Sequence, residues 1–155
     1  MLRRRGLLLS AMKRKVLFVC IHNSARSQMA EALLNAHAGD RFQAESAGLQ
    51  PGQLNPNVVE VLREKELDIS GKATRSVDEV LRARTNFDYV ITVCDEGTAA
   101  GCPNFPGAGE RLHWSFPDPS TFAGTLQERL EQTRTVRDLI ADRIAAWCHE
   151  QSVSA

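Results

Sequence analysis

The residue types best suited to chemistry lie in one short stretch, in which five residues separate Cys20 from Arg26 and Ser27 follows directly. An apolar run ends at Cys20, and a pattern with helical spacing begins at Ser27. A loop between a strand and a helix presents backbone N–H groups and the positive end of the helix dipole to an anion, and this field stabilises a thiolate. An arginine can hold two oxygens of such an anion. We therefore expect Cys20 to be a nucleophile and Arg26 to bind an oxyanion.

The whole loop is expected to contact the oxyanion. We also expect Ser27 to cap the helix and to donate its hydroxyl group to the Cys20 thiolate. The alternative is a buried structural cysteine beside a surface arginine, which the order of strand, loop and helix disfavours. The predicted substrate-binding residues are Cys20, Ile21, His22, Asn23, Ser24, Ala25, Arg26 and Ser27.

Two further cysteines, Cys94 and Cys102, lie eight positions apart in a segment with four glycines and two prolines, residues 94–110. Zinc needs three or four ligands at typical spacings, and the chain has no Cys-x2-Cys pair, so we predict no metal. A second alternative is that Cys94 and Cys102 are incidental and share no chemical role. A redox-active pair is favoured because glycines let the loop move, and thiol–disulfide exchange requires one sulfur to approach another.

An acidic residue, Asp118, is framed by proline on both sides in the segment Phe116-Pro-Asp-Pro-Ser120. The prolines restrict the backbone and could hold the carboxyl group over the anion site as a general acid. An aspartate that only forms a turn is the alternative.

The elements that must position these residues alternate between strands and helices. This alternation predicts a three-layer α/β fold, an open parallel four-stranded sheet with helices on both faces and sites at the carboxyl ends of the strands. In the last helix we expect Val136, Leu139, Ile140, Ile144 and Trp147 to share the buried face. The expected strands are 15–19, 43–47, 89–93 and 112–114, and the expected helices are 27–39, from 56 onward, 77–83 and 126–148.

Composition indicates one soluble domain: 155 residues, 43% hydrophobic and 25% charged, with no tract long enough to cross a bilayer. Residues 1–15 hold six of the 19 basic residues and no acidic one, so the remainder is negatively charged, which disfavours nucleic acid as a partner. We expect residues 1–12 to be a flexible extension, with Met12 as the native start, and residues 13–155 to form the domain. Leu7–Leu9 is too short for an export signal, so we expect a reducing, cytoplasmic location.

The run Cys20-Ile-His-Asn-Ser-Ala-Arg-Ser-Gln-Met-Ala-Glu31 resembles the signature of the low-molecular-weight phosphatase superfamily. Within the superfamily it is most similar to arsenate reductases that use thioredoxin or a related thiol reductant. The resemblance extends from about Lys15 to Trp147 and includes Ser46-Ala-Gly48, Asn55-Pro56, Asp68-Ile-Ser70 and His113-Trp114. It implies a low-molecular-weight phosphatase-like fold and a role in arsenic resistance.

The resemblance also implies a mechanism. Cys20 attacks arsenic while Asp118 protonates the departing oxygen, and Cys94 then attacks Cys20 and releases arsenite. Cys102 next attacks Cys94, and a thioredoxin-like partner reduces the resulting disulfide. The electrons come from thiols, so we predict no bound cofactor. The reductant could instead be a low-molecular-weight thiol that acts through glutaredoxin or a mycothiol-type relay.

Some of the resembling reductases bind potassium near the loop, through residues that match Asn23, Glu31 and Ser46. The fourth ligand there is an aspartate, where this chain has Arg75. We therefore expect Asn23 and Ser46 to support the loop without a metal.

Two other functions remain open at this point. A phosphotyrosine phosphatase would need only Cys20, Arg26 and Asp118, but the sequence Asp118-Pro-Ser-Thr121 lacks the aromatic residues of the resembling phosphatases. A non-catalytic oxyanion or redox sensor would keep the same loop and cysteines and signal to another protein.

Overall fold

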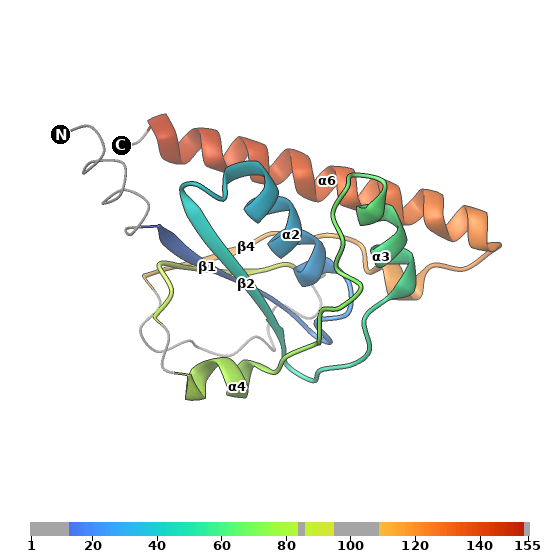
Figure 1. The fold of residues 1–155 in the computed structure, drawn as a ribbon, viewed down its shortest axis with the longest axis horizontal. Helices are drawn as coiled ribbons and strands as arrows, with labels where there is room; N and C mark the ends of the chain where they lie inside the picture. The colour runs from blue at the N-terminus through green and yellow to red at the C-terminus, as the bar shows by residue number, and fades with distance from the viewer. Residues whose placement is uncertain (1–12, 84–85, 95–108, 154–155) are drawn as a thin grey trace.

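The computed structural model describes residues 13–83, 86–94 and 109–153, so the predicted extension, residues 1–12, lies outside the described residues (Figure 1). Strands and helices alternate along the chain, as the sequence predicts. The elements are β1 (Arg14–Cys20), α2 (Arg26–Ala38), β2 (Phe42–Gly48), α3 (Pro56–Arg63), α4 (Val77–Arg82), β3 (Tyr89–Thr92), β4 (Glu110–His113), a short 3-10 helix (Pro119–Thr121) and α6 (Leu126–Val153).

The four strands form one parallel sheet in the order β2-β1-β3-β4, which confirms the predicted sheet. The chain passes from β1 to β2 on one side and returns to β3 on the other side. The carboxyl end of β1 is therefore the point at which the strand order reverses, where open α/β sheets bind ligands. Cys20 ends β1 opposite Gly48 of β2, and Val19 pairs with Thr92 of β3.

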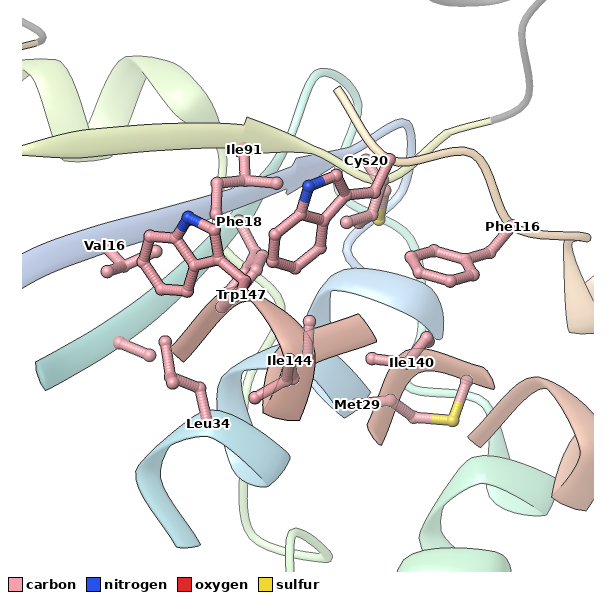
Figure 2. Packing of buried hydrophobic residues seen from close by; sticks show 14 of the residues in the cluster. Val16, Phe18, Cys20, Met29, Leu34, Ile91, Phe116, Ile140, Ile144 and Trp147 are labelled. Atoms are coloured by element: carbon pink, nitrogen blue, oxygen red, sulfur yellow. The ribbon is translucent and has the colours of Figure 1, made fainter. Parts of the chain in front are cut away.

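Helices cover both faces of the sheet, which confirms the three-layer prediction. Helices α2, α3 and α6 lie on one side and α4 lies on the other (Figure 1). The larger core packs Phe18 and Ile91 of the sheet against Met29 of α2 and Ile140 and Trp147 of α6 (Figure 2). Residues 16–20 of β1 are buried on both faces of the sheet, which explains why this part of the strand is a continuous apolar run.

A second, smaller core lies on the opposite face of the sheet. It packs Leu17 and Val19 of β1 and Val90 of β3 against Val77 and Val80 of α4. Side chains alternate across a strand, so neighbouring residues of β1 contribute to different cores. The reactive end of β1 is thus held from both sides.

Local sequence signals explain where two helices begin. The Asn55 side chain accepts a hydrogen bond from the Asn57 amide (2.9 Å), and Pro56 occupies the first helical position of α3, as expected. At α4, the Ser76 hydroxyl accepts a hydrogen bond from the Glu79 amide (3.1 Å). Both caps fix the direction in which the chain leaves the sheet edge.

Helix α6 differs from the prediction in two ways. It continues past residue 148 to Val153, and the Leu139 side chain is 46% exposed although we expected it to be buried. Successive helical residues are rotated by about 100°, so Leu139 lies beside the buried stripe of Val136, Ile140 and Ile144 and not within it. Among the described residues, no helix is both long enough and apolar enough to span a membrane.

Candidate active site

The loop between β1 and α2 is held by its carbonyl groups. The segment after β2 donates backbone hydrogen bonds to four of them: Leu49 to Cys20 (3.2 Å), Gln50 to Ile21 (2.8 Å), Gly52 to His22 (2.9 Å) and Asn55 to Ser24 (3.0 Å). The C=O and N–H groups of one peptide unit point in opposite directions, so the N–H groups that follow these carbonyls turn away from the 49–55 segment. Successive N–H groups on one side of a loop form an anion-binding concavity.

Asn23 fixes the loop from inside. Its side chain is completely buried, and its Oδ1 accepts hydrogen bonds from Gln28 Nε2 (3.1 Å) and the Arg75 amide (2.9 Å). Its Nδ2 donates to Ser27 Oγ (2.8 Å). The φ angle of Asn23 is +55°, a left-handed conformation that asparagine tolerates better than most residues. These contacts confirm the predicted scaffold role.

Gly48 permits β2 to approach this loop. A Cβ atom at position 48 would lie 2.7 Å from the Asn23 amide nitrogen and 2.8 Å from the Ile21 carbonyl oxygen. Real Cβ atoms do not come so close to backbone atoms, so the contact requires glycine.

The Cys20 thiol group lies within hydrogen-bonding distance of two groups of its own loop. Its Sγ is 2.8 Å from Ser27 Oγ and accepts a hydrogen bond from the Asn23 amide (3.2 Å), and the residue is only 3% exposed. Both contacts hold the sulfur atom in place at the end of β1. The predicted contact from Ser27 to the sulfur is present, but the predicted helix cap is wrong. Helix α2 has Ala25 at its N-cap with no side-chain hydrogen bond, because the Ser27 hydroxyl is directed to the sulfur.

Arg26 joins the loop to the segment that carries Asp118. Its Nη1 donates to the Phe116 carbonyl (3.1 Å), and its Nη2 lies 3.5 Å from Asp118 Oδ2. Asp118 Oδ1 accepts a hydrogen bond from the Ser120 amide (3.0 Å) and so begins the 3-10 helix. The carboxyl group is therefore fixed through both oxygens, and its side chain is 20% exposed.

One small pocket brings together most of the predicted groups, whereas Asn23 and Ser27 are fully buried and do not line it. Cys20, Arg26 and Asp118 all line it, and the other lining residues are His22, Ser24, Ala25 and Ser120. His22 is exposed, with Nδ1 3.0 Å from the Gln50 carbonyl, and half-buried Ile21 contributes its backbone rather than a pocket wall. A thiol nucleophile, a guanidinium, loop amides and a carboxyl group thus surround a space suited to a tetrahedral oxyanion.

Cys94 lies near this pocket but not in its lining. It follows β3, is completely buried, and its Sγ lies 3.8 Å from the carbonyl oxygen of Val19, the residue before Cys20. The expectation that Cys20 and Cys94 share one sheet edge is therefore met. Cys102 lies outside the described residues, so its role stays a prediction.

The potassium site of the resembling reductases does not fit these residues. Glu31 Oε1 accepts a hydrogen bond from Ser46 Oγ (3.0 Å), as a scaffold role requires, but Lys72 Nζ lies 2.5 Å from Glu31 Oε2. Arg75 pairs with Glu45 (3.1 Å). Two positive side chains thus lie where a further cation would be needed. Among the described residues, no group of three or more His, Cys, Asp or Glu side chains could hold a metal.

Three contributors to the site could not be found from sequence pattern. They are the Phe116 carbonyl that orients Arg26, the Gln28 amide that holds Asn23, and Lys72. The Phe116 carbonyl and Lys72 have partners distant in sequence, and the contact between Gln28 and Asn23 joins two side chains that no local pattern pairs. Only Gln28 gave a hint, as a polar residue among the buried positions of α2.

The fold and the pocket define a class of protein. The profile of the low molecular weight phosphotyrosine protein phosphatase family matches residues 15–154, and the chain belongs to this family. The chain is 41% identical over 133 residues to a protein of Bacillus licheniformis named arsenate reductase, which covers 85% of this chain and 93% of the relative.

Solved structures agree with this assignment. A thioredoxin-dependent arsenate reductase of Corynebacterium glutamicum has a TM-score of 0.64 and 32% identity, and the match covers 99% of this chain and 71% of that one. An arsenate reductase in its phosphate-binding state has a TM-score of 0.69 and 28% identity, and that match covers 88% and 98% of the two chains.

Proposed function

We propose that this protein is an arsenate reductase that acts through a relay of three cysteines and is recycled by a thioredoxin-like protein. The observation that carries the proposal is the pocket in which Cys20, Arg26 and Asp118 meet, with the buried Cys94 at the same edge of the sheet. The relatives named arsenate reductase support the choice of substrate.

The first step forms a covalent adduct. The Cys20 thiolate attacks arsenic, a sulfur–arsenic bond forms and an arsenic–oxygen bond breaks. Asp118 donates a proton to the departing oxygen, which leaves as water. Arg26 and the loop amides stabilise the negative charge on the remaining oxygens.

The next steps transfer two electrons. The Cys94 thiolate attacks the Cys20 sulfur, a disulfide forms, and the electron pair of the sulfur–arsenic bond passes to arsenic, which leaves as arsenite. Cys102 then attacks Cys94, the Cys20 thiolate is released, and a Cys94–Cys102 disulfide remains. A thioredoxin-like dithiol reduces this disulfide, so the protein itself carries no redox cofactor. These exchanges suit a reducing, cytoplasmic compartment.

Single-turnover arsenate reduction tests the proposal. The protein is fully reduced, freed of reductant and mixed with arsenate, after which arsenite is quantified and disulfides are mapped by mass spectrometry. We expect about one arsenite per chain and a Cys94–Cys102 disulfide, as the exchange sequence requires. Absence of arsenite would contradict the proposal.

A phosphatase is the second candidate, because the family to which the chain belongs is described as phosphotyrosine protein phosphatases. Cys20, Arg26 and Asp118 would suffice for hydrolysis of a phosphate monoester. We expect such activity to be weak, because the described residues that line the pocket include Ser120 and no Phe, Tyr or Trp. Fast hydrolysis of an aryl phosphate without arsenate reduction would favour this candidate.

A further inference from the structure

We propose that Lys72 is a tethered cation that neutralises Glu31 and positions the anion-binding loop, so that this protein needs no monovalent cation at that place. Glu31 belongs to α2 and is 6% exposed, and its Oε2 lies 2.5 Å from Lys72 Nζ. A carboxylate this deeply buried is costly unless an opposite charge and hydrogen bonds compensate it. Lys72 supplies the charge and Ser46 the hydrogen bond.

Lys72 begins the short segment that supports the loop. One residue later, the Ala73 carbonyl accepts a hydrogen bond from Gln28 (3.4 Å), and two residues beyond it the Arg75 amide donates to Asn23 (2.9 Å). The ion pair between Lys72 and Glu31 fastens this segment to α2. It therefore acts on Cys20 through Asn23 and Ser27, which makes Lys72 a positioning residue.

The surroundings of Glu31 explain why a lysine replaces a diffusible ion. A polar pocket beside the loop is lined in part by Gln28, Glu31, Ser46, Lys72 and Arg75. Glu45 also lines it, and the two cationic side chains pair with the two carboxylates, Lys72 with Glu31 and Arg75 with Glu45, so no unpaired negative charge remains there to attract a further cation. Gln28 Oε1 is buried and has no hydrogen-bond partner among the described residues. Removal of the lysine would thus leave oxygens of Gln28, Glu31 and Ser46 to bind a small cation.

The test is the variant Lys72→Met, with Lys65→Met as the matched control at an exposed position. Melting temperature and the alkylation rate of Cys20 by iodoacetamide are measured in potassium chloride and in choline chloride at equal ionic strength. We expect the wild-type protein and the control to behave identically in both salts. The Lys72→Met variant should melt at a lower temperature and react several-fold more slowly in choline chloride, and potassium should restore much of both losses.

Two further variants separate charge from packing. Lys72→Arg keeps the charge and should resemble the wild-type protein in both salts. Glu31→Gln combined with Lys72→Met removes both charges and should show no response to potassium. If Lys72→Met cannot be purified folded, Lys72→Gln replaces it in the same comparison.

Two outcomes would overturn the proposal. One is stabilisation of the wild-type protein by potassium but not by choline, which would show that the site takes a diffusible ion. The other is a Lys72→Met variant that equals the wild-type protein in both salts. The inference rests on the proposed function only where it concerns the benefit of Lys72 to catalytic turnover. The melting temperature and the alkylation rate of Cys20 are both measured without arsenate. Failure of arsenate reduction would therefore leave this test intact.

Discussion

The cysteines that the structure describes differ in their environments. Cys20 contacts Ser27 and a backbone amide, whereas Cys148 is packed within α6 and burial raises the pKa of its thiol above the ordinary value. A thiol with a raised pKa holds less thiolate at neutral pH and is a poor nucleophile. The environment of Cys148 therefore indicates a role in packing and separates it from the proposed relay.

The relay predicts a specific defect for Cys102→Ser. This variant should still release about one arsenite per chain in a single turnover and should stop as a Cys20–Cys94 disulfide, because the last exchange lacks its nucleophile. Steady-state turnover with thioredoxin should be lost. Cys148→Ala is the control and should turn over normally; unchanged turnover in Cys102→Ser would refute the relay.

The position of Asp118 leads to a prediction for Asp118→Asn. An amide cannot donate the proton that the leaving oxygen needs, so formation of the Cys20 adduct should slow by about 10²–10⁴-fold, the usual contribution of a general acid. Rapid-quench measurement of the first turnover checks this value. A variant with unchanged rates would assign Asp118 only to the turn and to the contact with Arg26.

Strand β2 packs closely against the loop between β1 and α2. The substitution Gly48→Ala should disturb this packing. The added methyl group would meet backbone atoms of the loop, and overpacking of this kind costs about 1–3 kcal/mol. We expect urea unfolding at lower concentration and a loss of arsenate reduction. Gly71→Ala is the matched control, because a Cβ atom there meets nothing within 4 Å, and its stability should be nearly unchanged.

Ion pairs between α3 and α6 lead to a pH-dependent prediction. The hydrogen bond from Arg134, followed by that from Arg137, lowers the pKa of Glu64 below its ordinary 4.5, while burial acts in the opposite direction. The folded state therefore favours the charged carboxylate. Its stabilisation is fully present above pH 4.5 and is lost as the pH falls through the lowered pKa of the folded protein.

The variant Glu64→Gln tests this linkage. Because the Arg134 and Glu64 side chains are 36% and 33% exposed and solvent screens their interaction, we expect a loss of about 1 kcal/mol or less at neutral pH. The difference from the wild-type protein should shrink as urea unfolding is repeated at progressively lower pH below 4.5. Glu60→Gln, in an exposed pair within α3, is the control; a difference that grows on acidification would contradict the assignment.

Over the whole molecule, the sequence pattern predicted the features that depend on residues close together in the chain. The strand, loop and helix around Cys20, the cap at Asn55 and the parallel sheet follow from local signals and are confirmed. The cap at Ser27 and the burial of Leu139 were wrong, because each depends on a contact that tertiary packing decides. The role of Lys72 was missed for the same reason, since its partner lies 41 positions earlier in the chain.

The burial of β1 on both faces has a consequence for how the protein would be recycled. The nucleophile lies at the end of a strand whose preceding residues, 16–19, are buried on both faces of the sheet. A large reductant cannot enter there, and the strand cannot bring Cys20 out without opening both cores. In the proposed relay, a further cysteine of the same chain, and not the external reductant, would therefore restore the Cys20 thiolate.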